Sequence, residues 1–229
     1  MHVPDGFLDA PTSVATGAVA VAGVAIALRK ARTELDDRTA PMAGLVAAFV
    51  FAGQMINFPV GAGTSGHLMG GALAAVLVGP WTAVLCTSVV LLVQALLMAD
   101  GGITALGTNI TLIGIVTVAV GWTVFVALRA VLPRRAGVVA PAAAIGAFVS
   151  VPVAAAVFTL LFSIGGQAPV DTGEVLTAML GWHVLIGIGE AVVTGLVVAS
   201  VMGARPDLVH GARRLVAKAD PDLAQGVVA

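Results

Sequence analysis

The sequence has 229 residues, of which 59% are hydrophobic and 10% are charged. Soluble domains carry about 25% charged residues, so this composition excludes water as the main solvent of the chain. The formal net charge of -1 points to no particular partner, and no nucleic acid is expected. The single cysteine, Cys86, excludes an internal disulfide and a thiolate metal cluster.

Apolar runs separated by short polar breaks fill most of the chain. A helix needs about 20 apolar residues to cross a bilayer core of roughly 30 Å, whereas the strands of a membrane barrel would alternate, and no alternation is visible. The pattern predicts an all-α integral membrane protein with a bundle of seven transmembrane helices. The predicted spans are residues 11–28, 41–57, 67–79, 81–99, 108–128, 138–163 and 176–203.

The third predicted span is short for a full crossing. Gly79 and Pro80 break the apolar run behind it, because proline removes a backbone donor and restricts the residue before it. A tight turn there would join the third and fourth spans.

The basic residues predict the orientation of the bundle. All 11 of them fall on one side of a seven-span arrangement: Arg29, Lys30, Arg32, Arg38, Arg129, Arg134, Arg135, Arg205, Arg213, Arg214 and Lys218. The positive-inside rule identifies that side as the cytoplasm, so the amino terminus is expected outside and the carboxyl terminus inside. The other face carries acidic side chains that would attract cations: Asp5, Asp9, Asp100, Asp171 and Glu174.

No second domain or internal repeat is indicated. Residues 1–203 are expected to form one seven-helix transmembrane domain, followed by a short cytoplasmic tail over residues 204–229. His210 lies in this tail among arginines, which favours a solvated side chain.

The amino terminus does not resemble a secretory signal. Such a signal begins with positive charge and continues into an apolar stretch, whereas this chain opens MHVPDGFLDAP. We therefore expect the terminus to be retained outside the membrane. Pro4, Asp5 and Gly6 have turn chemistry, and Phe7 and Leu8 are apolar anchors.

A histidine at position two has a specific chemical meaning. The Met1 amine, the His2 amide nitrogen and the His2 imidazole can chelate one metal through a five-membered and a six-membered ring. Three nitrogens in a plane suit Ni(II), Cu(II) or low-spin Co(II), whereas Mg(II) and Ca(II) prefer oxygen. The alternative is that His2 is an ordinary exposed residue.

His67 is the candidate fourth ligand. It follows a glycine-rich external loop and is expected to begin the third helix, on the same side of the membrane as His2. Thr64 and Ser65 would cap that helix or bond the other imidazole nitrogen. A structural histidine at a helix start is the alternative.

Four motifs follow one another along nearly the whole chain: MHVPDGFL from residue 1, GTSGHLMGG over 63–71, LLVQALLMADGGITALGTN over 91–109 and HVLIGIGEAVVTG over 183–195. Together they resemble the CbiM/NikM family, the substrate-binding membrane components of energy-coupling factor (ECF) importers for cobalt and nickel. The resemblance implies seven transmembrane helices with the amino terminus outside. It also implies a square-planar metal site formed by Met1, His2 and His67, within the 1–203 domain.

The resemblance further implies partners. They are a transmembrane coupling subunit and cytoplasmic ATPase subunits, since the chain contains no GxxxxGK[ST] phosphate loop of its own. Some family members carry a fused carboxyl-terminal extension, so a separate small accessory membrane subunit is expected here. The expected location is the cytoplasmic membrane of a bacterium or archaeon, in contact with lipid. No cofactor is expected, because Co(II) or Ni(II) would be the transported substrate.

Further polar residues at membrane depth invite a functional interpretation. His183 and Glu190 are two helical turns apart and project from one face, and ionisable groups in a membrane usually face a bundle interior. A network bracing the metal loop, a structural interhelical hydrogen bond and direct ligation are the alternatives. Buried polar groups need partners, and the other candidates for the surroundings of the metal are Asn57, Gln94, Asp100 and Asn109.

Two other classes of function compete with metal capture. A proton- or ion-coupled secondary transporter would use Glu190 and His183 as its coupling pair. An intramembrane hydrolase would need a nucleophile and base, and Ser88, Ser150 and Ser163 have no histidine nearby in sequence. Cobalt and nickel are not distinguished by the ligand set, although the missing extension favours cobalt for cobalamin biosynthesis.

Overall fold

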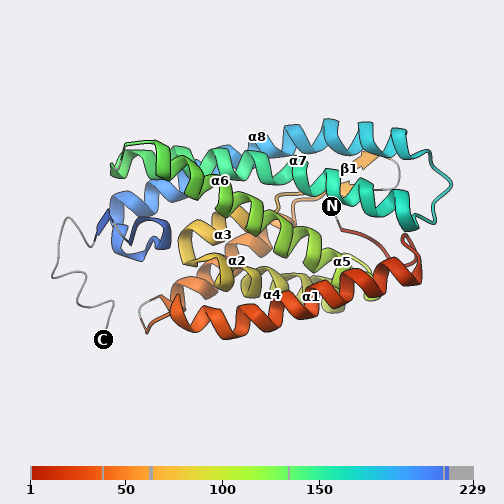
Figure 1. Ribbon diagram of the computed structural model, residues 1–229, viewed down its shortest axis with the longest axis horizontal. Helices are drawn as coiled ribbons and strands as arrows, with labels where there is room; N and C mark the ends of the chain where they lie inside the picture. The colour runs from red at the N-terminus through yellow and green to blue at the C-terminus, as the bar shows by residue number, and fades with distance from the viewer. Residues whose placement is uncertain (1, 38, 62–63, 134, 214, 217–229) are drawn as a thin grey trace.

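The computed structural model describes residues 2–37, 39–61, 64–133, 135–213 and 215–216, and leaves the side chains of residues 58–65 undescribed. Helices dominate these ranges (Figure 1). The long elements are α1 (Ala10–Lys30), α2 (Ala40–Gln54), α4 (Pro80–Leu97), α6 (Thr117–Val131), α7 (Val139–Gly165) and α8 (Thr172–Ala204). The shorter ones are η1 (Ala31–Thr33), α3 (Gly71–Val78), α5 (Leu106–Asn109), the π-helix η2 (Ile110–Val116), η3 (Ala136–Val138), η4 (Pro206–Leu208) and η5 (His210–Ala212).

Within the described residues, five helical segments are long and apolar enough to cross a membrane: Ala10–Thr33, Pro80–Leu97, Leu106–Val131, Ala136–Gly165 and Thr172–Ala204. The prediction of an all-α, multi-pass membrane protein is thereby confirmed in outline. The predicted second and third spans coincide with the shorter helices α2 and α3, of 15 and 8 residues.

The segment before α3 differs from its prediction. Residues Phe58–Gly61 and Thr64–Gly66 form a short antiparallel hairpin, β1 and β2, and α3 begins at Gly71, not at His67. The expectation that His67 starts a helix was therefore wrong. Gly70, with φ +77°, is the N-cap of α3, and the role expected for the Thr64 and Ser65 side chains stays a prediction because those side chains lie outside the description.

Acidic and proline residues define where the long helices begin. The Asp9 carboxylate accepts a hydrogen bond from the Thr12 amide (2.9 Å) and caps α1, with Pro11 in its first turn. Asp171 caps α8 in the same way through the Gly173 amide (2.8 Å). Such caps satisfy amides that have no partner inside the helix.

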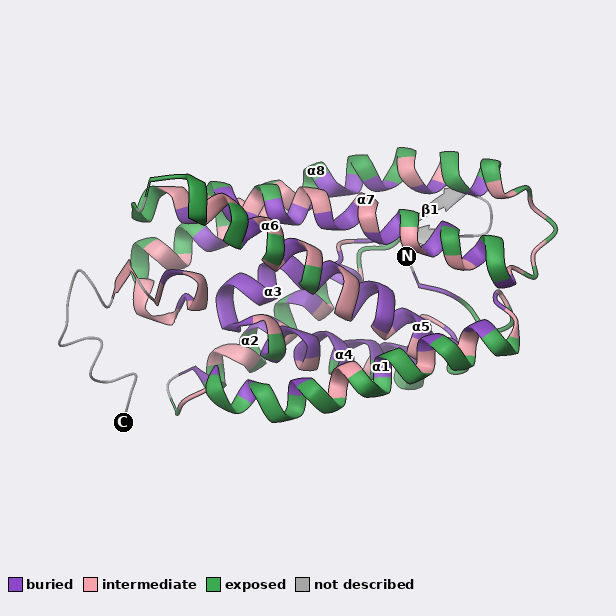
Figure 2. Ribbon diagram, in the orientation of Figure 1, coloured by how far each residue is buried: buried purple, intermediate pink, exposed green. Residues whose placement is uncertain are grey.

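Helix α3 occupies the centre of the molecule. All eight of its residues are buried (Figure 2). Gly79, with φ +98°, and Pro80 make the tight turn into α4 that the sequence predicts. The buried Glu34 caps the start of α4 by accepting hydrogen bonds from the Trp81 amide (3.2 Å), the Thr82 amide (2.7 Å) and the Thr82 hydroxyl (2.9 Å).

Helices α7 and α8 pack against each other along one side of the molecule (Figure 1). The outward face of α8 presents large apolar side chains that a soluble protein would bury, namely Leu185, Ile188, Val192 and Leu196. This face suits hydrocarbon as its solvent, because a helix satisfies its own backbone groups there.

The segment after α8 folds back onto the bundle. Val209 and Ala212 are buried, and the His210 ring packs against Trp122 with ring centroids 5.5 Å apart. Burial, with a smaller effect of Arg213, lowers the pKa of His210 to about 4. The expectation of a solvated His210 was therefore wrong, because the tail meets an aromatic surface that sequence position does not show.

Candidate metal centre

The amino-terminal segment is held inside the molecule by backbone pairing. The Asn109 side chain accepts a hydrogen bond from the Val3 amide (2.7 Å) and donates one to the Val3 carbonyl (3.1 Å), much as a neighbouring strand would. The same carbonyl accepts a bond from the Gly102 amide (2.9 Å). Val3 is buried, so the backbone next to His2 is held in one position.

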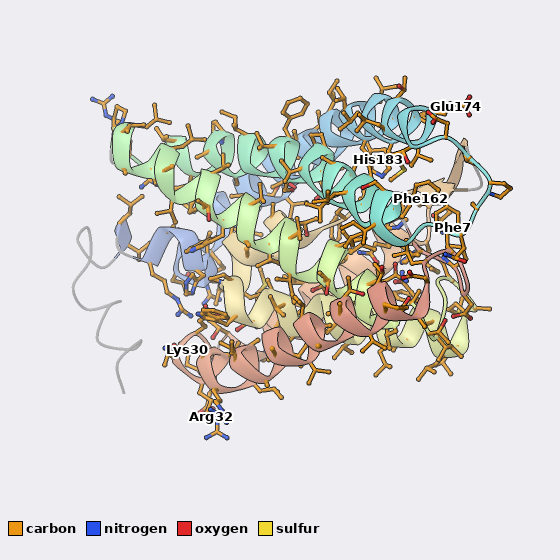
Figure 3. All side chains as sticks on the ribbon, turned by 45° about the vertical axis from the view of Figure 1, so that its right-hand side comes forward. Phe7, Lys30, Arg32, Phe162, Glu174 and His183 are labelled. Atoms are coloured by element: carbon orange, nitrogen blue, oxygen red, sulfur yellow. The ribbon has the colours of Figure 1, made fainter. Side chains whose placement is uncertain are left out.

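Residues 5–9 make further contacts with Thr104 and with the end of α7. Asp5 accepts hydrogen bonds from the Thr104 hydroxyl and amide, which lower the pKa of its carboxyl group. The Phe7 ring packs against Phe158 and Phe162 (Figure 3). Backbone bonds from the Asp9 amide to the Gly165 carbonyl (2.7 Å) and from the Gln167 amide to the Phe7 carbonyl (3.0 Å) join the segment to the end of α7.

His2 lies buried at the start of this segment, with 6% of its surface exposed. Its Nδ1 atom lies 3.0 Å from Asp100 Oδ1. The other Asp100 oxygen accepts a bond from the Asn57 side chain (2.9 Å). These contacts, led by the one with His2, lower the pKa of Asp100.

His67 is completely buried and is oriented by its own neighbour. Its Nδ1 lies 2.7 Å from the Leu68 carbonyl, which can only accept, so the ring proton belongs on Nδ1 and Nε2 carries the lone pair. Burial, together with the nearby His2 and His183, lowers the pKa of His67 well below its ordinary value. A neutral imidazole with a free lone pair is the form that binds metals.

The two imidazoles meet. The His2 and His67 rings stack with centroids 4.3 Å apart and planes inclined by 23°. Both ring nitrogens of His2 and Nε2 of His67 are buried and have no hydrogen-bond partner in the described part of the chain. Because buried polar atoms are rarely left unpaired, these nitrogens indicate a place for a ligand.

The remaining donors must come from elsewhere. Among the described residues, no group of three or more His, Cys, Asp or Glu side chains could hold a metal ion. Met1, the other predicted ligand, lies outside the described residues. In the chelate ring predicted for residues 1 and 2, the imidazole atom that binds is Nδ1. Chelation therefore requires the His2 ring to leave Asp100.

The other predicted residues occupy different positions around His2 and His67. Asn57, Asp100 and Asn109 make the contacts described above, whereas the side chains of Thr64 and Ser65 lie outside the description. His183 is buried, with Nδ1 2.7 Å from the Met179 carbonyl. Gln94 is buried, and its side-chain amide has no bond among the described residues.

Two side chains hold the backbone that follows His67. The Glu190 carboxylate accepts hydrogen bonds from the Met69 amide (2.6 Å) and the Gly70 amide (2.9 Å). Gln54 donates from Nε2 to the Met69 carbonyl (2.8 Å). Gln54 was missed in the sequence, although a glutamine near the end of an apolar span is the kind of signal that identified Gln94.

A sequence profile described as "CbiM: Cobalt uptake substrate-specific transmembrane region" matches residues 2–208. The chain belongs to the CbiM family. Its members named as cobalt and nickel transport proteins are similar along most of this chain. The cobalt transport protein CbiM of Sorangium cellulosum is 37% identical over 218 residues, which cover 91% of this chain and 94% of that protein.

A second CbiM relative is longer. The fused nickel transport protein NikMN of Rhodobacter capsulatus is 35% identical over 221 residues, which cover 91% of this chain and 64% of that protein.

The fold is also known from crystals. A truncated transition metal transporter is similar with a TM-score of 0.82 and 30% identity, over 89% of this chain and 99% of that chain. This CbiM chain is therefore a membrane component of cobalt or nickel transport.

Proposed function

We propose that this protein is the substrate-capture subunit of an ECF-type importer for divalent cobalt or nickel. The observation that carries the proposal is the stacked pair of buried imidazoles, in which His2 Nδ1 and His67 Nε2, the two ring atoms that would bind, have no hydrogen-bond partner among the described residues. Imidazoles are good ligands for late divalent metals and poor ones for Mg(II) or Ca(II).

The proposed site is square-planar. The Met1 amine, the His2 amide nitrogen and His2 Nδ1 supply three donors, and His67 Nε2 supplies the fourth. Asp100 holds the His2 ring before metal arrives and releases it on binding. Asn109 keeps the chain at Val3 in place, and His183 and Gln94 complete the polar surroundings of His67.

The proposed topology places the metal site outside the cell, with residues 1–203 as a seven-helix domain and residues 204–229 as a cytoplasmic tail. The arrangement of charge supports it: Lys30 and Arg32 lie at the opposite end of the molecule from Phe7 and Glu174 (Figure 3). A coupling subunit and ATPase subunits would supply the energy. A small accessory membrane subunit would be a further partner, and the metal would serve cobalamin biosynthesis or nickel enzymes.

The competing functions find less support. In a proton-coupled transporter Glu190 would need to exchange protons with a pathway, yet both of its oxygens accept backbone bonds. The hydroxyls expected to serve a hydrolase, those of Ser88, Ser150 and Ser163, each bond a carbonyl of their own helix.

The decisive experiment compares one preparation before and after a change at its amino terminus. The protein is made with a protease-removable leader that leaves Met1 first after cleavage, and Co(II) and Ni(II) affinities are measured in detergent. Cleavage should strengthen binding by more than about 100-fold, which exceeds the effect typical of mutating a residue that only contacts a metal ligand. The cleaved protein with bound Ni(II) should show the visible absorption of a square-planar complex.

His2→Ala and His67→Ala variants of the cleaved protein test the two side chains separately, and each should lose binding by a similar factor. Equal affinity with and without the leader would show that the terminal amine is not a ligand. A leader of several residues is required, because a single added residue would place the histidine third and create a different nitrogen chelate.

A further inference from the structure

His67 is presented by a segment that is neither helix nor strand. Residues 67–70 lie between β2 and α3, and among the described residues the His67 ring has one hydrogen-bond partner, the carbonyl of its neighbour Leu68. The position of His67 Nε2 is therefore set by whatever holds the backbone of these four residues.

Two side chains from two other helices hold that backbone. Glu190 of α8 bonds the Met69 and Gly70 amides, and Gln54 of α2 bonds the Met69 carbonyl. Gln54 and Met69 have no exposed surface, and Glu190 has 1%. Because an unpaired buried amide costs about 1–3 kcal/mol, the segment has a strong preference for this one arrangement.

Water offers little substitute for these bonds. The cavity beside Glu190 is lined mainly by apolar side chains, including Phe49, Val50, Leu73 and Val193, and only about 20 Å³ is accessible to the centre of a water molecule. That is room for about one water. Gly70 adds a steric limit, since a Cβ atom there would lie 2.8 Å from the Val50 side chain.

Glu190 is poorly placed to be a ligand itself. Each of its carboxylate oxygens already accepts a backbone bond. Glu190 also belongs to no group of three or more His, Cys, Asp or Glu residues that could hold a metal ion among the described residues. Among the described residues, its hydrogen bonds reach His67 through the backbone of Met69 and Leu68.

We infer that Glu190 and Gln54 are positioning residues for metal capture, which clamp the Met69–Gly70 backbone so that His67 Nε2 stands beside His2. The inference rests on the proposed function. It also makes His67 sensitive to any shift of α8 relative to α2, because the clamp joins those two helices.

The test uses Glu190→Gln and Gln54→Leu, with Thr194→Val as a matched control. Glutamine keeps one acceptor but turns an NH₂ group toward a backbone amide, so one bond is lost. Thr194 lies one turn further along α8, lines the same cavity and bonds no residue of the segment among those described. Ni(II), Co(II) and Cu(II) affinities, the visible spectrum of the Ni(II) complex and metal-free thermal stability are measured for each variant.

Each clamp variant should lose about tenfold or more in affinity, as outer-shell partners of metal ligands do, and should change the Ni(II) spectrum. Thr194→Val should leave both unchanged. A double-mutant cycle then separates positioning from general damage. In a His67→Ala background, measured with the more tightly bound Cu(II), Glu190→Gln should have no further effect on affinity.

The inference is overturned if Glu190→Gln keeps native affinity and spectrum, or if it weakens binding equally in the presence and absence of His67. Failure of the parent protein to bind any of these metals would instead overturn the proposed function.

Discussion

The two ends of the buried helix α3 use the same device for different purposes. At its start, Glu190 accepts bonds from the Met69 and Gly70 amides. At its far end, about 12 Å away for eight residues, Glu34 accepts bonds from Trp81 and Thr82, where α4 begins. Each carboxylate is buried and satisfies amides at the start of a helix.

The difference lies in what each held segment carries. The segment bound by Glu34 is a turn that joins two helices, and the backbone carbonyl of Glu34 accepts a bond from the Arg213 side chain (2.8 Å). The segment bound by Glu190 carries a histidine whose Nε2 has no partner among the described residues. One carboxylate therefore serves the fold, and the other serves the fold and, as we propose, a ligand.

The glycines beside the two carboxylates should show the largest effects. Gly70→Ala and Gly79→Ala each place a side chain at positive φ and against a neighbour, Val50 at 2.8 Å or Glu34 at 2.5 Å. Each should cost about 3 kcal/mol of stability, but only Gly70→Ala should weaken metal binding. Thermal unfolding and metal titration check this, with Gly44→Ala, which meets nothing within 4 Å, as control. Equal loss of metal binding in both glycine variants would contradict the difference in role between the two ends of α3.

Glu34→Gln tests the far end directly. Exchange of one acceptor for a donor should leave one amide unpaired and cost about 2 kcal/mol of stability. Metal affinity should stay within about twofold of the parent, against the tenfold loss expected for Glu190→Gln. A Glu34→Gln variant with weakened metal binding and unchanged stability would contradict the division of roles.

Asn109→Leu sharpens the comparison at the metal end. The variant loses both bonds to Val3, so the amino-terminal segment should be less ordered and metal affinity should fall by about tenfold, or 1.4 kcal/mol. Isothermal titration in detergent measures this. Thr104→Val, which removes only a hydroxyl bond to Asp5, is the matched control and should lose less than Asn109→Leu.

The smallest effect is expected at the tail, which packs on the Glu34 end. The pKa of His210 is lowered to about 4 from an ordinary 6.5. Docking of the tail is therefore fully favoured above pH 6.5 and weakens as the pH falls toward 4, by about 1 kcal/mol once partial exposure is allowed for. Trp122 fluorescence, with the other two tryptophans replaced by Phe, reports the change. His210→Leu should show no pH dependence in this range, and a pH-dependent signal in that variant would assign the change elsewhere.

The spacing of apolar residues predicted much of the fold. The spacing of apolar runs placed six of the seven predicted spans on long helices or on α2, and Gly79 and Pro80 predicted the turn before α4. The pairing of Phe58–Gly61 with Thr64–Gly66 was not predicted, because a glycine-rich run is compatible with many backbone conformations. His67 was consequently predicted to begin the third helix, whereas it lies four residues before the first residue of α3.

By itself, the sequence determined the membrane class, the family and the candidate ligands His2 and His67, because hydropathy and residue chemistry are local properties. Only the tertiary structure decided which side chains hold those ligands. Gln54, Asn109 and Glu190 lie far from their partners along the chain, and their bonds depend on how the helices pack. The contact of His2 with Asp100 was equally beyond sequence reasoning, since a ring orientation is set by neighbours in space.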